Sequence, residues 1–174
     1  MSAHSVPRKY LPQFVYGGID GIITTFAVIA GVVGAQLSLR VILILGFANL
    51  LADGFSMAAS SYLSSESKSE LDGNGVAGLQ PSASKEALAT FVAFVLLGLI
   101  PLLPFALATI LPLTQMMTIL LSAGATTVGF ALVGAGKAYV ADKTLLRAVV
   151  ETVVIGGLAA TIAFTVGYLL RGLA

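Results

Sequence analysis

The sequence contains no cysteine and no tryptophan. The absence of cysteine excludes disulfide bonds, thiolate metal sites and cysteine nucleophiles. The absence of tryptophan leaves 5 tyrosines and 9 phenylalanines as the aromatic residues that can anchor helices at a membrane surface. Any metal site in this chain must therefore use oxygen, nitrogen or thioether ligands.

Charge is scarce as well. Only 10% of the 174 residues are charged, whereas a soluble domain carries about 25%. Hydrophobic residues make up 57% of the chain, and its mean hydropathy is +1.00. These values exclude an ordinary water-soluble globule, so we expect a lipid bilayer around the chain. A net charge of +1 without a basic patch predicts no nucleic-acid partner.

Five hydrophobic stretches are long enough to cross a bilayer. A helix rises about 1.5 Å per residue and the hydrocarbon core is about 30 Å thick, so a span needs roughly 20 mostly apolar residues. A membrane barrel would show shorter, alternating segments. The sequence predicts an all-α integral membrane bundle of five transmembrane helices, forming a single domain over residues 1–174. The predicted spans are Phe14 to Gln36, Arg40 to Leu63, Leu88 to Leu111, Thr114 to Tyr139 and Leu145 to Leu170.

The distribution of basic residues predicts the orientation of these spans. Seven lysines and arginines fall on the side of the amino terminus, against Arg40 and Arg171 on the other side. By the positive-inside rule, the amino terminus is cytoplasmic. Residues 64–86 then form a short, flexible cytoplasmic loop. A prokaryotic inner membrane is favoured, with a vacuolar-type membrane as the alternative. The seven residues are Arg8, Lys9, Lys68, Lys85, Lys137, Lys143 and Arg147.

Two aspartates lie inside predicted spans at the same depth. Asp20 precedes the first outer turn at Leu37 by 17 residues, and Asp53 follows it by 16. Both therefore lie about 24 to 26 Å from that turn. Thr24 follows Asp20 by one helical turn and is in reach of its hydrogen bonding. Charged residues inside spans are costly and usually line a functional path. A buried, hydrogen-bonded lock between helices is the alternative role for these acids.

The second span carries a polar stripe around Asp53. Asn49, Asp53 and Met57 recur every fourth residue, with Ser56 and Ser60 beside them. A carboxylate, an amide oxygen and a thioether form a ligand set suited to a divalent transition metal such as Fe(II) or Mn(II). Methionine also fills gaps in hydrophobic cores, so a packing role for Met57 stays open.

Small residues line the first span. Gly17, Gly21, Gly31 and Gly34 form small-xxx-small pairs, which allow neighbouring helices to approach closely. We expect these glycines to serve helix packing. The same residues also leave room for a site at the packed interface.

A further ionisable pair is predicted near the cytoplasmic ends of the fourth and fifth spans. Lys137 and Glu151 lie on either side of the short connection between these spans. A structural ion pair would keep both side chains charged at moderate depth and is the favoured interpretation. A proton relay is the alternative.

Several motifs resemble the vacuolar iron transporter family, including its nodulin-like members. The resemblance covers nearly the whole chain, and its first two motifs are the specific ones. They are Gly18-Ile19-Asp20-Gly21 with Thr24-Thr25-Phe26-Ala27, and Asn49-Leu50-Leu51-Ala52-Asp53-Gly54-Phe55-Ser56-Met57. The weaker ones are Gly98-Leu99-Ile100-Pro101, Gly134-Ala135-Gly136-Lys137 and Glu151 followed by Ile155-Gly156-Gly157.

The resemblance implies a five-helix, usually dimeric transporter that moves Fe(II), and often Mn(II), out of the cytosol in exchange for protons. It identifies Asp20 and Met57 with residues of the family's translocation path. Asn49 stands where some members carry a glutamate, and Asp53 would supply the missing charge. Metal is then the cargo, so we expect no cofactor and no enzymatic activity.

One departure from the family concerns the cytoplasmic loop. Many members carry a helical metal-binding domain there, and this chain retains only a short segment, as nodulin-like members do. Its four acids, Glu66, Glu70, Asp72 and Glu86, are interpreted as solvated loop charges.

The residues themselves suggest how metal and protons would be exchanged. Two desolvated carboxylates near one another favour holding a proton when empty, and a divalent cation displaces that proton. An intramembrane aspartyl protease is a rival interpretation of two matched aspartates, although a nearby thioether has no part in that chemistry. A non-transporting structural membrane dimer is the other rival.

Overall fold

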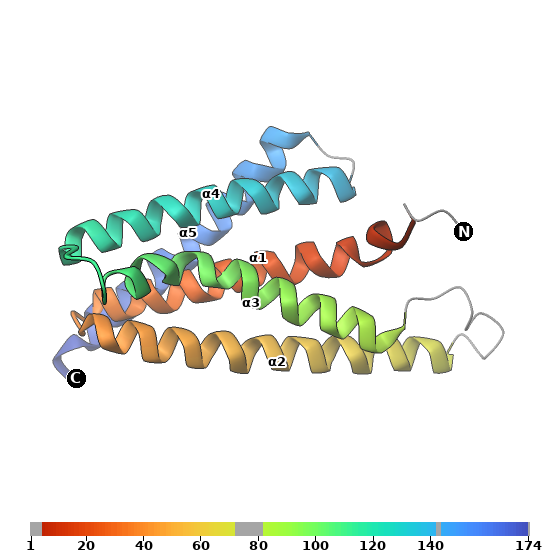
Figure 1. The fold of residues 1–174 in the computed structure, drawn as a ribbon, viewed down its shortest axis with the longest axis horizontal. Helices are drawn as coiled ribbons and strands as arrows, with labels where there is room; N and C mark the ends of the chain where they lie inside the picture. The colour runs from red at the N-terminus through yellow and green to blue at the C-terminus, as the bar shows by residue number, and fades with distance from the viewer. Residues whose placement is uncertain (1–4, 72–81, 142–143, 174) are drawn as a thin grey trace.

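The computed structural model describes residues 5–71, 82–141 and 144–173. The described residues form five long helices and one short 3-10 helix, and the long helices run alternately in opposite directions (Figure 1). The elements are α1 (Ser5–Gly34), α2 (Leu39–Leu71), α3 (Ala83–Leu107), α4 (Gln115–Ala141), α5 (Leu145–Leu170) and η1 (Arg171–Leu173).

All five long helices are long and apolar enough to cross a membrane. The predicted fold, an all-α integral membrane bundle of five helices, is therefore confirmed. The spans found by length and hydropathy are Tyr10–Gly34, Leu39–Leu71, Ala83–Leu107, Gln115–Tyr139 and Leu145–Leu173.

The predicted loop over residues 64–86 was too long. Helix α2 continues to Leu71 and α3 already begins at Ala83, while residues 72–81, with the predicted turn and Asp72, lie outside the described part. Hydropathy ends a span where polar residues begin, but a polar helix continues outside the bilayer when its side chains find partners. Here the Tyr62 hydroxyl donates to Glu66 Oε1 at 2.7 Å, one turn further along α2.

A tight turn joins α1 to α2. Gln36 has a φ of 59°, in the left-handed region, and the amide of Leu37 donates to the carbonyl of Val32 at 3.1 Å. This is the Schellman arrangement that ends many helices, with glutamine in the place usually taken by glycine. Because the turn is so short, α2 must return antiparallel beside α1.

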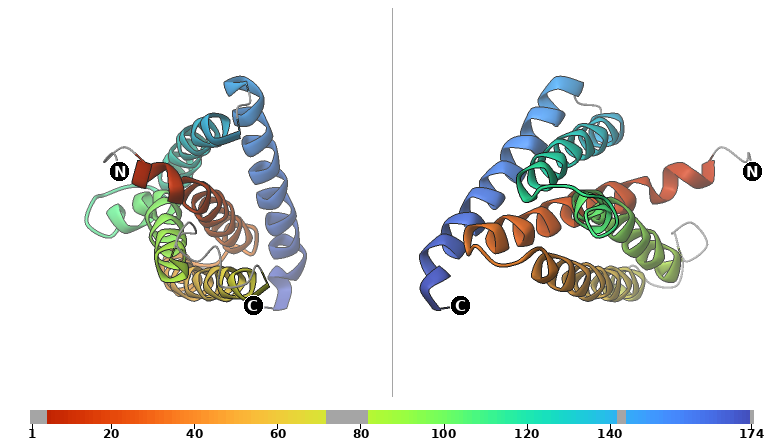
Figure 2. Two further views of the ribbon diagram at one scale, coloured as in Figure 1. Left: turned by 90° about the vertical axis from the view of Figure 1, so that its right-hand side faces the viewer. Right: turned by 60° about the vertical axis from the view of Figure 1, so that its left-hand side comes forward.

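Helix α1 is the central helix of the bundle (Figure 2). One hydrophobic cluster joins it to α2 and α3 through Ile29, Ile42 and Phe94. A second cluster joins it to α4 through Ile22 and Phe130. The other helices surround α1, so residues on its faces determine what can lie inside the bundle.

Glycines allow the backbones of α1 and α3 to touch. A Cβ atom added at Gly21 would lie 2.3 Å from the carbonyl oxygen of Phe94, and one at Gly17 would lie 2.6 Å from that of Thr90. Both distances are far shorter than any real Cβ contact. The sequence predicted close packing at these two positions, and the structure identifies α3 as the neighbour.

The same device holds α5 against α1 near the opposite end. A Cβ atom at Gly34 would lie 2.2 Å from the carbonyl oxygen of Phe164, and one at Gly167 would lie 2.0 Å from that of Gly31. At Gly31 itself the nearest atom would be 3.5 Å away, which is an ordinary contact. The close approach at Gly31 therefore depends on Gly167, which the sequence analysis did not single out.

One end of the bundle is stepped. On the side of the amino terminus, α1, α2 and α3 extend beyond the ends of α4 and α5 (Figure 1). The protruding part of α2 contains its polar carboxyl-terminal turns, including Ser64 and Glu66. This end of α2 therefore presents hydroxyl and carboxylate groups past the level at which α4 and α5 stop.

Replacing Gly21 by alanine tests the α1–α3 contact. The added methyl group meets backbone that cannot move freely, so we expect Gly21→Ala to lower the free energy of unfolding by about 1–3 kcal/mol, as overpacking typically does. Thermal unfolding of the purified protein in detergent measures this. Gly157→Ala on α5 is the matched control, because an added Cβ there has no atom within 4 Å. Equal unfolding temperatures for the two variants would contradict the close approach.

Candidate metal site between α1 and α2

Asp20 and Asp53 lie at matched depth. Asp20 is fourteen residues before the end of α1 at Gly34, and Asp53 is fourteen residues after the start of α2 at Leu39. Both are therefore about 21 Å along their helices from the turn that joins them. The tight turn at Gln36 fixes this register, because it leaves no slack for one helix to slide along the other.

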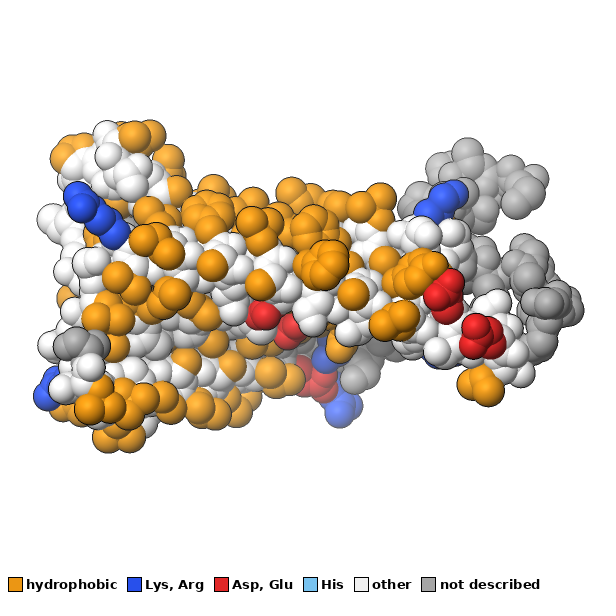
Figure 3. Space-filling view, turned by 90° about the horizontal axis from the view of Figure 1, so that it is seen from below, with side chains coloured by type: hydrophobic (Ala, Val, Ile, Leu, Met, Phe, Trp, Pro, Cys, Tyr) orange, Lys and Arg blue, Asp and Glu red, His pale blue; other side chains and the backbone are white. Residues whose placement is uncertain are grey.

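The two carboxylates lie near one another on a hydrophobic molecule. Both are partly buried, and Asp53 is the charged side chain close enough to affect Asp20. Figure 3 shows acidic side chains midway along a face that is otherwise largely hydrophobic. Thr24 donates its hydroxyl proton to the backbone carbonyl of Asp20 at 2.8 Å, not to the carboxylate. The hydrogen bond between Thr24 and Asp20 thus forms through the backbone, because the helical carbonyl one turn back is the closer acceptor.

Met57 and Asn49 lie one helical turn on either side of Asp53. Met57 is partly buried and both packs against the core cluster of α1, α2 and α3 and lines a cavity. Its packing role is thus observed, and its role as a metal ligand stays a prediction. The Nδ2 atom of Asn49 is buried and has no hydrogen-bond partner in the described part of the chain. This unpartnered atom is a hydrogen-bond donor, so it suits a water molecule or another acceptor, and only the amide oxygen could bind a metal ion.

The acids do not form a closed metal cage. Among the described residues, no three histidine, aspartate or glutamate side chains come together in a group that would hold a metal ion. Asp20 and Asp53 provide two carboxylates, and the other candidate ligands, Asn49 and Met57, are neutral. Two carboxylates with neutral neighbours bind a cation less tightly than a full carboxylate cage does. Such weaker binding is what a transported ion needs in order to leave its site.

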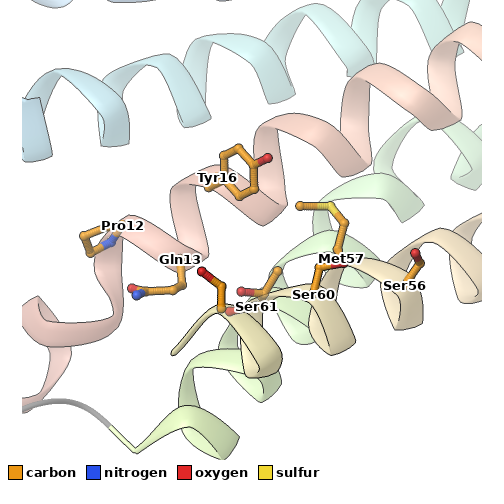
Figure 4. Close-up of a pocket in the computed structure, with 9 residues that line it drawn as sticks. Pro12, Gln13, Tyr16, Ser56, Met57, Ser60 and Ser61 are labelled. Atoms are coloured by element: carbon orange, nitrogen blue, oxygen red, sulfur yellow. The ribbon is translucent and has the colours of Figure 1, made fainter. Parts of the chain in front are cut away.

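A cavity of about 510 Å³ opens between α1 and α2 next to the acids (Figure 4). It ends one helical turn from each aspartate, because Tyr16 precedes Asp20 by four residues and Met57 follows Asp53 by four. Helix α1 contributes Pro12, Gln13 and Tyr16 to its wall. Helix α2 contributes Ser56, Met57, Ser60, Ser61 and Ser64, and α3 contributes Thr90.

Several residues of this cavity were missed in the sequence. Gln13 lies one residue before the predicted first span, and Ser64 falls in the predicted loop. A signal was present: Ser56, Ser60 and Ser64 recur every fourth residue and continue the stripe of Asp53 towards the end of α2. Stopping the helix at Leu63 hid that continuation.

An ion cluster ties α4 to α5. Lys137 Nζ lies 3.0 Å from Glu151 Oε2, and Arg147 Nε lies 3.1 Å from Glu151 Oε1. The side chains of Lys137 and Glu151 are 27% and 31% exposed. The structure thus brings the predicted pair together and adds Arg147. Each oxygen of the carboxylate accepts a charge-assisted hydrogen bond, the arrangement expected of a structural ion pair.

Glu86 is not a solvated loop charge. It is only 9% exposed, in the first turn of α3, and accepts a hydrogen bond from the Ser65 hydroxyl of α2. The earlier interpretation is wrong for this residue because α2 and α3 extend further than predicted and face each other here. The amino-terminal end of a helix also favours a carboxylate. Glu66 and Glu70 are exposed, as expected of solvated charges.

The ion cluster can be tested through stability. Glu151→Gln leaves two cations without their carboxylate, and we expect it to lower the free energy of unfolding by about 1–3 kcal/mol, between the values for exposed and buried pairs. Lys137→Met keeps the pair of Arg147 with Glu151 and should cost less. Thermal unfolding in detergent compares them. An unchanged unfolding temperature for Glu151→Gln would show that the cluster does not stabilise the fold.

Comparison with known sequences places the chain among transporters of one family. The VIT family model matches residues 11–78 and 75–168, nearly the whole chain. A vacuolar iron transporter of Toxoplasma gondii is 46% identical over 61 residues, 35% of this chain and 20% of that protein. One of Plasmodium berghei is 42% identical over 62 residues, 36% of this chain and 23% of that protein.

A plant relative aligns over a longer stretch. Vacuolar iron transporter homolog 4 of Arabidopsis thaliana is 30% identical over 112 residues, 59% of this chain and 57% of that protein. The chain therefore spans about a fifth of the length of the first two relatives and a little over half of the plant protein. The family match, unlike these partial alignments, covers α2, α3 and α4 in full and most of α1 and α5. The chain belongs to the VIT family.

Proposed function

We propose that this chain exports Fe(II), and also Mn(II), from the cytosol in exchange for protons. The observation that carries the proposal is the pair of carboxylates, Asp20 and Asp53, at one depth of a membrane bundle with Met57 one turn away. Membership of the VIT family and the names of the relatives, vacuolar iron transporters, support a metal ion as the substrate. The metal is the cargo, and the proposal needs no bound cofactor.

The chemistry of exchange follows from shared oxygens. Two carboxylates in a poorly hydrated place repel each other, so an empty site holds a proton more readily than an exposed one. A divalent cation satisfies both charges and releases that proton. Metal and proton then occupy the same oxygens of Asp20 and Asp53 in turn. The thioether of Met57 favours a transition metal such as Fe(II) or Mn(II) over Mg²⁺, which prefers an all-oxygen, hydrated environment.

The direction of transport rests on the orientation of the bundle. The ends that carry most of the basic residues lie together, because the helices alternate in direction. The positive-inside rule makes this end cytoplasmic, with the amino terminus, in a prokaryotic inner membrane or a vacuolar-type membrane. The cavity between α1 and α2 lies at this same end, so metal reaches Asp20 and Asp53 from the cytosol. Lys143, one of the seven basic residues, is outside the described part.

A second copy of the chain is the proposed cover for the acidic face. Acidic groups on a lipid-facing surface are costly, and acids inside membranes almost always face a bundle interior or a water-filled space. Asp20 and Asp53 are only partly buried within one chain. A homodimer that joins the α1–α2 faces of two copies removes these carboxylates from lipid.

A protease function is not supported. The family match indicates a non-enzymatic transporter, in agreement with the expectation of no enzymatic activity. The cavity beside the aspartates is lined by serine, glutamine and methionine side chains, which a proton-sharing aspartate pair would not require.

Transport can be measured in vesicles that contain the purified protein. We expect Fe(II) and Mn(II) flux that accelerates when protons are supplied from the opposite side and slows when an ionophore removes the proton gradient. Asp20→Asn removes one of the two carboxylates that bind metal and proton in turn, so we expect at least a tenfold loss of flux. Met57→Leu keeps the packing volume and should mainly reduce the preference for Fe(II) over Mg²⁺.

The control for this assay is Glu70→Gln, which changes an exposed acid at the protruding end of α2. Its flux should match that of the unchanged chain. Full flux in Asp20→Asn, together with an unchanged preference for Fe(II) over Mg²⁺ in Met57→Leu, would refute the proposed path. Loss of stability in Asp20→Asn, with flux per folded molecule unchanged, would instead identify the aspartates as a helix lock in a structural dimer.

The dimer can be mapped by cross-linking, since the sequence has no cysteine of its own. Tyr16 on α1, one helical turn before Asp20, and Leu120 on α4 are 68% and 63% exposed. We expect Tyr16→Cys to give cross-linked dimers in membranes with a short thiol reagent, and Leu120→Cys to give few. Equal cross-linking at both positions would argue against pairing through the α1–α2 face.

A further inference from the structure

The cavity between α1 and α2 is polar but carries no charge. None of its lining side chains is ionised at neutral pH, and most present a hydroxyl group (Figure 4). It lies at the stepped end of the bundle, where α1 and α2 extend past α4 and α5. Its inner end is one turn from Asp20 and Asp53. An ion that approaches the aspartates from this end between α1 and α2 passes through the cavity.

The serine hydroxyls of this cavity are not used by the fold. Threonines elsewhere in the bundle bond to the carbonyl four residues back, as Thr126 does to Ser122 at 2.7 Å. Within the described residues, Ser60, Ser61 and Ser64 make no such bond or any other side-chain hydrogen bond to protein. Their oxygens and protons remain available to whatever occupies the space between the helices.

Two other groups in the wall act as acceptors. The Oε1 atom of Gln13 is buried and has no hydrogen-bond partner in the described part of the chain. The Thr90 hydroxyl already donates its proton to the carbonyl of Glu86 at 3.0 Å, so its free capacity is its lone pairs. An unsatisfied buried amide oxygen is costly, and a ligand that donates hydrogen bonds would satisfy it. The wall thus suits an occupant rich in donors.

A hydrated divalent cation has that property. Its bound waters point their protons outwards, and transition-metal and Mg²⁺ ions carry about six waters in an octahedral shell. At about 30 Å³ per water, such a shell fills roughly 180 Å³. The cavity, at about 510 Å³, holds the hydrated ion with further water around it. Neutral acceptors bind the water shell without replacing its waters. In this respect the cavity differs from the carboxylates one turn away, which bind the ion directly.

We propose that the cavity lined by Gln13, Ser60, Ser61, Ser64 and Thr90 is a waiting site for a hydrated divalent metal ion, held through its water shell. This proposal rests on the proposed function, since it supplies the step before capture by Asp20 and Asp53. Met57, at the inner end of the cavity, is the first group that replaces a bound water. The waiting site stands in for metal capture by the helical domain that many family members carry between the second and third spans, where this chain has a short connection from Leu71 to Ala83.

Vesicle flux against Mn(II) concentration tests the waiting site. Gln13→Leu combined with Ser60→Ala removes two contacts to the shell, and we expect KM to rise about threefold to tenfold with the maximal rate unchanged. Asp20→Asn should instead reduce the maximal rate. Ser67→Ala, an exposed serine on α2 outside the cavity, is the matched control and should change neither value. A KM that stays unchanged in the double variant overturns the proposal.

Direct binding separates this proposal from the transport proposal. Pulsed electron paramagnetic resonance of Mn(II) on the purified chain counts bound ions and their waters. With Asp20→Asn and Asp53→Asn in place, we expect one weakly bound Mn(II) that keeps nearly all its waters, and its loss when Gln13→Leu and Ser60→Ala are added. Mn(II) binding that vanishes with the aspartates, or survives the cavity variants, overturns the waiting site whether or not flux is observed.

Gln13→Glu gives a test that misfolding cannot imitate. The two side chains have the same shape, and the added carboxylate attracts the cation directly. We expect Mn(II) to bind at least tenfold more tightly to Gln13→Glu, with fewer waters retained. Unchanged affinity would place Gln13 outside any metal site and overturn the proposal.

Discussion

The close approach of α1 to its neighbours is the constraint on which the other features depend. Gly17 and Gly21 bring the backbone of α1 against α3, and Gly34 and Gly167 bring it against α5. A single side-chain carbon at these glycines would separate the helices. Because backbone contacts with α3 and α5 fix the orientation of α1, the face that carries Gln13, Tyr16 and Asp20 is directed towards α2. The proposed metal path thus depends on how tightly the rest of α1 is packed.

The acidic residues of the bundle fall into two kinds, those paired with cations and those that are not. Glu151 is paired on both oxygens, with Lys137 and Arg147, so its charge is balanced within the protein. Asp20 and Asp53 lie near one another, and no lysine or arginine of the described residues forms an ion pair with them. A balanced cluster stabilises one arrangement of helices. An unbalanced pair has an affinity for whatever positive charge arrives, which suits a site that must be filled and emptied.

Much of the fold was predictable from the sequence, because a lipid bilayer restricts the structures that can cross it. Lipid demands long apolar helices, so hydropathy alone located the five spans, and the positions of Asp20 and Asp53 relative to one turn gave their common depth. Contacts between helices were harder to predict from the sequence. Gly17 and Gly21 were recognisable as packing residues, but nothing in the sequence named α3 as their partner or singled out Gly167. Gln13, Ser64 and Glu86 were missed because they lie where hydropathy falls, and hydropathy cannot tell a polar helix from a loop.

The contact of Gly34 and Gly167 with the opposite backbones also has a mechanical side. It joins α1 and α5 near one end only, while towards the other end α5 diverges from α1 and packs on α4 (Figure 2). Such a joint acts as a fulcrum about which α1 swings together with α3, because Gly17 and Gly21 hold these two helices in contact, and Asp20 lies about 21 Å along α1 from it. A swing of about 10° at the fulcrum would displace Asp20 by roughly 4 Å at this length. That displacement exceeds the width of a water molecule, so a modest rotation is enough to open or close a route for an ion.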